Sequence, residues 1–346
     1  MWAWRARPRA APHSRRNIAV SGVPAQRGRW DRRRVIGYAV GVLLLAAAVW
    51  AVASQRGAMA GSMNAVRAAP AWMIAVALLL PAGNWIASSA SLRALTLRRA
   101  RGQHVRRDEM LALVGSAWLL NYLPMRPGMI GRIAYHKRFN RIPVRDSVLV
   151  LVEANAMTAG AVGLMLALAL TLRAAPPWGS WSWLVLALPG AAFVCAWAIG
   201  AARGSAWTAW AVAAAARYAD LLVWLARYAC AFALLGRPLT VEAAAVLAAV
   251  SQAAFLVPFV GNGLGVREWG IGLVAASWAG VDSAREAAAF GLAADLLNRA
   301  AEVAVSVPVG IACTAWLGRR VARSGPDTGS GLGGGGDPAD DAGRTE

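Results

Sequence analysis

Long apolar runs alternate with short basic segments along this chain. Runs without any Asp, Glu, Lys or Arg occupy 35–55, 68–92, 154–172, 174–202 and 243–266. A helix that crosses the hydrocarbon core of a bilayer needs about 20 predominantly apolar residues, and a helix satisfies all of its own backbone hydrogen bonds in lipid. The pattern predicts an all-α integral membrane protein with about six full transmembrane helices, at 35–54, 70–91, 146–172, 181–202, 206–235 and 286–317.

Two further pairs of segments are too short to cross the bilayer as single helices. The first pair is 110–125 and 126–145, and the second is 240–258 and 266–280. If 110–125 crossed fully, the basic segment after it would lie outside the cell, against the positive-inside rule. We therefore expect two re-entrant helical hairpins that enter from opposite faces, with an inverted repeat as one way of relating them.

Composition excludes an ordinary soluble enzyme. Charged residues make up only 15% of the chain and hydrophobic residues 58%, whereas about 25% of the residues of a soluble domain are charged. The net charge of +19 would suggest nucleic-acid binding, but the basic residues lie between the apolar runs. With residues 1–34 in the cytoplasm, 27 of the 36 basic residues fall on that side. This distribution predicts a multi-pass protein of the cytoplasmic membrane, with both termini cytoplasmic and no nucleic-acid partner.

The same pattern divides the chain into three parts. We expect a basic cytoplasmic segment at 1–34, a transmembrane domain at 35–317 and a disordered, Gly/Asp-rich cytoplasmic tail at 318–346. The three Cys and three His lack the paired spacing of metal ligands. We therefore expect no metal and no cofactor.

The two hairpin tips are similar in sequence. In each, a proline is followed by a glycine turn and then by an arginine four residues past a glycine, as in Gly128 with Arg132 and Gly263 with Arg267. Broken helices in corresponding positions of two halves are typical of transporter binding sites, and helix N-termini beside arginines suit an anionic group such as phosphate. The alternative is a pair of kinked helices in an ordinary bundle, with Arg267 paired locally to Glu268.

Ionisable residues within the spans are the other candidate chemistry. Each costs about 2.5–3.5 kcal/mol to insert, so such residues usually face the interior of the bundle. Two helices carry them as stripes, and the i,i+3 and i,i+4 spacings in the second stripe predict local pairs between Arg299 and its acidic neighbours. Two interpretations stay open, namely ion pairs that only hold helices together and a polar pathway that accepts a charged headgroup or relays protons. The residues are Arg217, Asp220 and Arg227 in the first stripe, Asp295, Arg299 and Glu302 in the second, and Glu153 early in the span from 146.

Residues at both tips resemble the motifs of a known membrane family. They are Asn121, Leu123, Pro124, Arg126, Gly128 and Arg132 at the first tip, Pro258, Gly263, Leu264, Gly265, Arg267 and Glu268 at the second, and Arg299 in the last span. This pattern resembles the lysylphosphatidylglycerol synthase transmembrane-region family, also called the flippase-like domain family, over roughly 35–317.

The resemblance implies a lipid flippase. Its cargo would be a phospholipid, an aminoacyl-phosphatidylglycerol or a polyprenyl-linked sugar, and membrane lipids would be its partners. Arg132, Arg267 and Arg299 would contact the headgroup phosphate, while Glu153, Glu268 and Glu302 would balance those charges or meet a cationic headgroup.

The soluble aminoacyl-transfer domain of the bifunctional members is not found in the sequence. We therefore expect a transporter and not an enzyme, with any lipid-modifying enzyme encoded separately. Two alternatives stay open: a non-transporting scaffold of a cell-envelope complex, and a membrane transferase that acts on lipid-linked sugars. A transferase would need accessible carboxylates. The adjacent Asp108 and Glu109 lie in an Arg-rich loop, which counts against this alternative.

Overall fold

The computed structural model describes residues 64–100, 104–121, 127–174, 181–205, 207–256, 266–278 and 284–323, and these contain helices but no strand. The expected span at 35–54 lies outside the described residues, as does the chain after 323. Following a short helical segment at 64–68, the helices are α3 (Ala71–Arg99), α4 (Arg107–Leu120), α5 (Pro127–Phe139), α6 (Val144–Ala174), α7 (Ser182–Ala202), α8 (Thr208–Leu234), α9 (Val241–Phe255), α10 (Val266–Trp278) and α11 (Ala284–Arg323).

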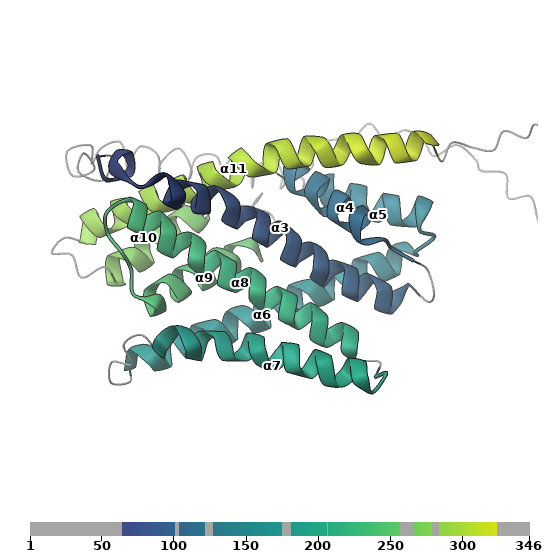
Figure 1. Cartoon of the computed structure of the whole chain (residues 1–346), viewed down its shortest axis with the longest axis horizontal. Helices are drawn as coiled ribbons and strands as arrows, with labels where there is room; N and C mark the ends of the chain where they lie inside the picture. The colour runs from purple at the N-terminus through teal and green to yellow at the C-terminus, as the bar shows by residue number, and fades with distance from the viewer. Residues whose placement is uncertain are drawn as a thin grey trace, which may run out of the picture.

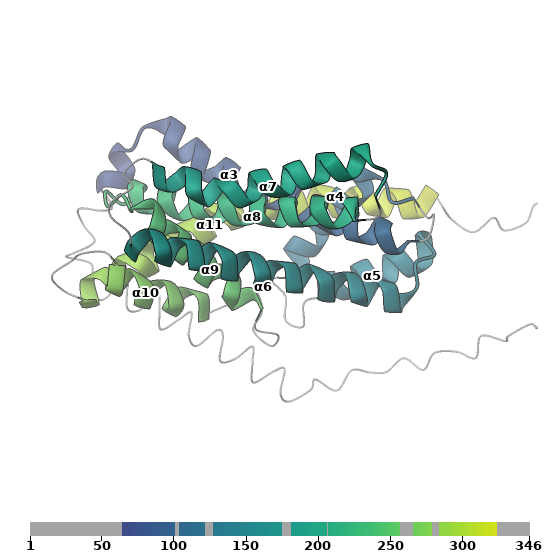
Figure 2. The ribbon, with the colours of Figure 1, turned by 90° about the horizontal axis from the view of Figure 1, so that it is seen from below.

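Five of these helices are long and apolar enough to cross a membrane: α3, α6, α7, α8 and α11. They run along the long axis of the molecule (Figures 1 and 2). At 1.5 Å per residue the 21 residues of α7 extend about 31 Å, which matches the roughly 30 Å hydrocarbon core. The prediction of helices without strands is confirmed for the described residues. The five long apolar helices have the length and composition of membrane spans and fall on five of the six expected ones. The last one continues to Arg323, so residues 318–323 are helical and not part of a disordered tail.

Two pairs of short helices complete the described bundle. Helices α4 and α5 have 14 and 13 residues, and α9 and α10 have 15 and 13, so each is about 20 Å long. The helices within each pair pack against each other. Figures 1 and 2 show α4 and α5 at one end of the bundle and α10 at the opposite end, with α9 extending from that end toward the middle. The connecting residues 122–126 and 257–265 lie outside the described residues, and Arg126, Gly263 and Gly265 with them.

Local sequence signals set several helix ends. Gly204 and Gly236 have positive φ angles of 61° and 76°, a conformation that glycine adopts without steric cost. After α7 and α8, the two residues that follow each C-cap donate backbone hydrogen bonds back into the last turn, which is the Schellman arrangement. At the start of α9, the Thr240 side chain accepts a hydrogen bond from the Ala243 N–H and so satisfies one of the free N–H groups there.

Helix α11 contacts both short pairs through glycines. A Cβ added at Gly310 would collide with Leu119 of α4, and one added at Gly115 of α4 would lie 2.6 Å from the Cys313 sulfur. At its other end, a Cβ at Gly291 would lie 2.6 Å from the Ala275 Cβ of α10. The backbone of α11 therefore approaches α4 near one end and α10 near the other, so one helix supports both pairs.

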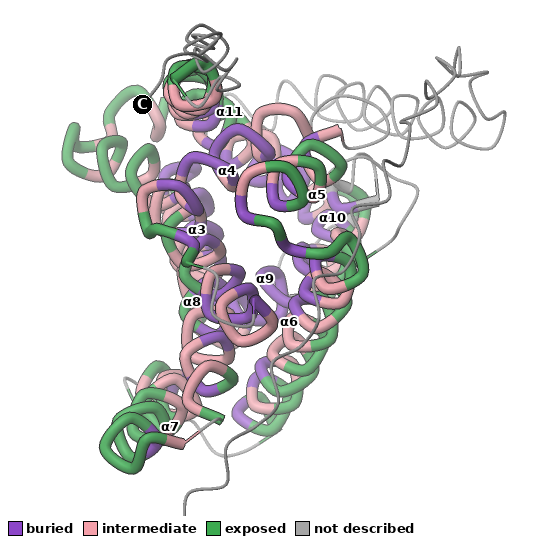
Figure 3. The backbone as a smooth tube through the Cα atoms, turned by 90° about the vertical axis from the view of Figure 1, so that its right-hand side faces the viewer, coloured by how far each residue is buried: buried purple, intermediate pink, exposed green. Residues whose placement is uncertain are grey.

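The outer surface is apolar where lipid would contact it. Helix α7 lies at the periphery and is largely exposed (Figure 3). Trp181 and Trp183 are exposed at its start, and Trp207 and Trp210 just beyond its end. Tryptophan concentrates at both membrane–water interfaces. The two tryptophan pairs therefore mark the ends of a segment about as long as the hydrocarbon core is thick.

Candidate functional site

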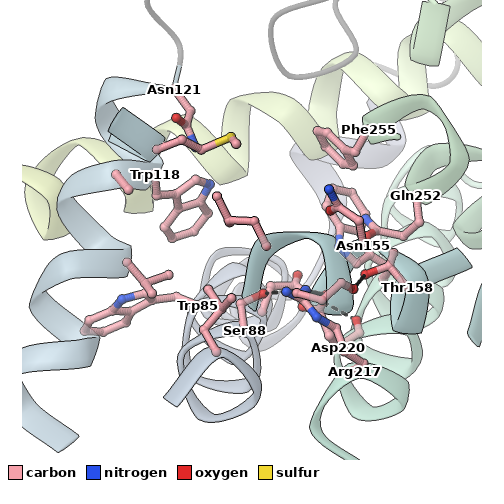
Figure 4. Close-up of a pocket in the computed structure, with 18 of the residues that line it drawn as sticks. Trp85, Ser88, Trp118, Asn121, Asn155, Thr158, Arg217, Asp220, Gln252 and Phe255 are labelled. Atoms are coloured by element: carbon pink, nitrogen blue, oxygen red, sulfur yellow. Dashed lines mark hydrogen bonds and ion pairs between the residues drawn. The ribbon is translucent and has the colours of Figure 1, made fainter. Parts of the chain in front are cut away.

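A cavity of about 260 Å³ lies inside the bundle, between the two short-helix pairs. Its walls come from α3, α4, α5, α6, α8, α9 and α11. Trp118 and Asn121 contribute from the end of α4, Arg132 from α5, and Gln252 and Phe255 from the end of α9. Figure 4 shows the tryptophans on one side of this cavity and the amides of α6 and α9 on the other. The cavity thus lies where both helix pairs are interrupted.

Asn84 of α3 connects two charged groups of α8. Its Nδ2 donates to Asp220 Oδ1 at 2.8 Å and to the Asp220 backbone carbonyl at 2.9 Å. Its Oδ1 accepts from Arg227 Nη1 at 2.9 Å. Asn84 is 7% exposed and lies within the long apolar run 68–92. This amide therefore satisfies both an anion and a cation within the span.

Glu302 of α11 is the carboxylate on which most donors converge. Arg227 Nη2 lies 2.8 Å from its Oε2 and Arg267 Nη1 lies 3.6 Å from the same oxygen. Trp118 Nε1 donates to Oε1 at 3.3 Å. Arg227 also donates through Nε to Asn298 at 2.8 Å and stacks 3.8 Å from the Trp224 ring centroid. The Arg227 guanidinium is therefore fully engaged by protein groups.

Arg267 of α10 pairs with Asp295 of α11. Its Nε lies 3.0 and 3.1 Å from the two Asp295 oxygens, and the Tyr228 hydroxyl donates to Oδ1 at 2.7 Å. The side chains of Arg267 and Asp295 are 1% and 0% exposed. The sequence spacing predicts a pair between Asp295 and Arg299 on one helix; in the structure Asp295 instead bonds to a residue of the neighbouring helix. Arg299 is half-buried and interacts electrostatically with Glu302.

The sequence also allows a local pair between Arg267 and Glu268 on the same helix. The side chain of Glu268 lies outside the described part of the structure. The interhelical pair with Asp295 places an opposite charge and hydrogen bonds beside the buried Arg267 guanidinium, which offsets part of its desolvation cost.

Arg132 differs from the other buried arginines. Its side chain is 8% exposed and lines the cavity. Among the described residues, none forms a hydrogen bond or ion pair with its guanidinium. Burying an unpaired charge is costly, so this group is a strong site for a bound anion.

A second arginine near Arg132 is only loosely paired. Arg217 Nη1 lies 3.6 Å from Asp220 Oδ2 and 3.3 Å from Ser88 Oγ, while its Nε is buried without a hydrogen-bond partner. The positive charges of Arg132 and Arg217 repel each other. Both arginines therefore retain unused hydrogen-bonding capacity that faces the cavity.

Two of the predicted site residues, Glu153 and Gly128, make contacts that hold helices together. Glu153 of α6 forms ion pairs with Arg98, at 2.5 Å, and with Arg99, both at the end of α3, and it is not among the described residues that line the cavity. Gly128 is buried against α4, and a Cβ there would lie 2.5 Å from the carbonyl oxygen of Ala117. Glu153 fastens α6 to α3, and Gly128 permits close packing of α5 on α4.

The structure places at the site several residues that the sequence did not single out, among them Asn84, Trp118 and Gln252. A signal was present for Asn84, since an amide in the middle of a 25-residue uncharged run is costly unless it faces the interior. Trp118 and Gln252 lie in the short helices, where a single indole or amide carries no such signal. Of the predicted residues, the structure brings Asn121, Arg132, Arg217, Asp220, Arg227 and Glu302 to the cavity.

No family model, curated protein or solved structure matches this chain. Within the described residues, no group of three or more His, Cys, Asp or Glu side chains is placed to hold a metal ion. The geometry and charges of the cavity are therefore the evidence for its function.

Proposed function

We propose that this chain is a lipid transporter that binds a phosphate-bearing headgroup in the central cavity and moves it between the leaflets of the cytoplasmic membrane. The observation that carries the proposal is Arg132, a buried guanidinium that faces the cavity without an acidic partner among the described residues. A guanidinium binds phosphate through two parallel hydrogen bonds. Arg217 of α8 lines the same cavity and supplies further donors.

The position of the cavity supports transport. It lies inside a bundle of membrane-length helices, between two short-helix pairs at opposite ends. In the proposed arrangement the pairs are re-entrant hairpins from opposite faces, as in transporters that alternate access around a central site. Opening at one end exposes the cavity to the cytoplasm, and opening at the other exposes it to the outside.

The buried ion pairs would hold the moving parts together. Arg267 joins α10 to α11 through Asp295, and Arg227 joins α8 to α11 through Glu302. The glycine contacts of α11 with α4 and α10 place both short pairs against the same helix. Movement at one pair would therefore be transmitted to the other through α11.

The motif resemblance to the flippase-like domain family supports the same class of function, with both termini cytoplasmic and membrane lipids as partners. We assign the chain no chemical reaction. Any enzyme that modifies the transported lipid would be a separate protein.

Transport can be tested in proteoliposomes that contain phosphatidylglycerol with a fluorophore on one acyl chain. Dithionite quenches the fluorophore in the outer leaflet only, so transport appears as a larger fraction of quenched signal. We expect the wild-type protein to transport this lipid and Arg132→Gln to reduce the rate by about tenfold or more, because a bidentate charged contact is lost.

Arg138→Gln is the matched control, since Arg138 lies on the same helix but is exposed. It should transport at the wild-type rate. Equal rates for all three proteins, or no transport by correctly folded wild-type protein, would contradict the proposal.

A further inference from the structure

The charges that line the cavity do not balance. Three arginines and two carboxylates line it among the described residues: Arg132, Arg217, Arg227, Asp220 and Glu302. Arg217 pairs with Asp220 and Arg227 with Glu302, so the positive charge in excess within this lining is that of Arg132. A ligand with a single negative charge would neutralise it.

Neither cavity carboxylate is available to a positively charged ligand. Both oxygens of Glu302 accept from protein donors, Oε1 from Trp118 and Oε2 from Arg227, with Arg267 close to the same oxygen. Asp220 accepts from Asn84 and pairs with Arg217. An ammonium group in this cavity would find both carboxylates already occupied by arginines. The positive charge of Arg132 would also repel it.

Uncharged polar side chains also line the cavity, beside apolar ones such as Leu92, Met129 and Phe255. Gln252 is 6% exposed, and no described residue hydrogen-bonds its side chain. The Asn121 Oδ1 is buried without a partner. Figure 4 shows Gln252, Asn155 and Thr158 together on one side of the cavity. Amides both donate and accept, so these groups match the hydroxyls of a polyol.

The volume of the cavity suits a small headgroup. At about 260 Å³ the cavity lies at the small end of the range for small-molecule sites, roughly 300–1,000 Å³. A phosphate with one small polyol is therefore a better match than an oligosaccharide.

We infer that the cavity selects a lipid headgroup with one phosphodiester charge, hydroxyl groups and no amine, such as phosphoglycerol, and discriminates against ethanolamine and aminoacylated headgroups. This inference rests on the proposed transport function and makes it specific. Gln252 is the specificity-determining residue, because it occupies the position where a carboxylate would create an ammonium site.

The test compares phosphatidylglycerol with phosphatidylethanolamine, each with the fluorophore on an acyl chain, in the dithionite assay. We expect wild-type protein to transport phosphatidylglycerol at least about tenfold faster, since like-charge placement in a site suppresses the wrong ligand strongly. Gln252→Glu has nearly the same shape and adds the missing carboxylate. It should lower the phosphatidylglycerol rate and raise the phosphatidylethanolamine rate.

Gln252→Leu is the neutral control, since it removes the amide without adding charge. It should slow phosphatidylglycerol and leave phosphatidylethanolamine unchanged, and thermal melting in detergent checks that each variant folds. If both lipids move at equal rates and both depend on Arg132, the transport function stands and the inference of selectivity is overturned. An unchanged lipid preference in folded Gln252→Glu would overturn it as well. If neither lipid shows transport that depends on Arg132, the proposed function itself fails.

Discussion

The Arg267 guanidinium of α10 and the Asp295 carboxylate of α11 form an ion pair of 3.0 Å in which both side chains are almost completely buried. The pair joins the second short-helix pair to the long helix that also contacts the first. Removing one partner of a buried ion pair leaves an uncompensated charge, which typically costs about 3–5 kcal/mol. The pair is therefore a structural joint next to the cavity.

Arg267→Ala should lower the melting temperature in detergent and the yield of folded protein together. The double variant Arg267→Met with Asp295→Leu replaces both charges by apolar groups and should recover much of the loss, because no buried charge then lacks a partner. Thermal melting of the single and double variants measures this. A single variant as stable as the wild type would show that the joint contributes little.

Gly128→Ala should destabilise the α4–α5 pair. The added Cβ would lie 2.5 Å from the Ala117 carbonyl oxygen, and backbone atoms cannot turn aside as a side chain can. Overpacking of this kind costs roughly 1–3 kcal/mol. Gly131→Ala on the same helix is the control, since nothing lies within 4 Å of its added Cβ.

Gly131→Ala should be neutral or slightly stabilising, because alanine is favoured over glycine within a helix by about 1 kcal/mol. Both variants are compared by thermal melting in detergent. Equal melting temperatures for the two variants would show that α5 does not lie as close to α4 as described.

A buried cluster at the end of the first pair makes stability depend on pH. His136 in the last turn of α5 lies 3.1 Å from Asn140, which donates to Glu109 of α4. Burial lowers the pKa of His136 to about 4, whereas an unfolded histidine has a pKa near 6.5. Between these values the unfolded chain binds the proton more readily, so His136 lowers stability as the pH falls from 7 to 5.

The size of this effect is about 2 kcal/mol at pH 5. The melting temperature should therefore fall from pH 7 to pH 5 more steeply for the wild type than for His136→Gln, which cannot be protonated. Parallel pH profiles for the two proteins would contradict the burial of a neutral histidine at this position.

Asn84→Leu should weaken the contact between α3 and α8. Replacing the amide leaves Asp220 without its best donor and removes an acceptor from Arg227. An unsatisfied buried group costs about 1–3 kcal/mol, and more when it is charged. Ser88→Ala on the same helix is the control, because Ser88 makes only a 3.3 Å contact with Arg217. Thermal melting should separate the two variants, and a wild-type value for Asn84→Leu would count against the bridge.

The sequence predicted the helices well and the side-chain partners poorly. Apolar runs fix the length and place of a membrane helix, and the prolines and glycines near 124 and 258 correctly separated the short helices. Both signals are local. The choice of partners is not, because it depends on which helices pack together.

Asp295 illustrates the difference. Local spacing favours Arg299 as its partner, but packing of α10 on α11 brings Arg267, which is 28 residues away in the chain, to its carboxylate. Glu153 likewise pairs with Arg98 and Arg99, more than 50 residues earlier. The hairpin motif in the sequence already pointed to Arg132. That no described residue pairs with its guanidinium follows only from the packing of the helices.

The most direct test of the central claim is to find where a lipid headgroup binds. A phosphatidylglycerol analogue with a photoreactive diazirine on the headgroup glycerol is incorporated with the protein into vesicles and irradiated, and labelled peptides are identified by mass spectrometry. We predict labelling of cavity-lining peptides of α4, α5 and α9, with loss of that labelling in Arg132→Gln and not in Arg138→Gln. Labelling confined to the peripheral helix α7, or labelling of the cavity peptides that is unchanged in Arg132→Gln, would contradict the account.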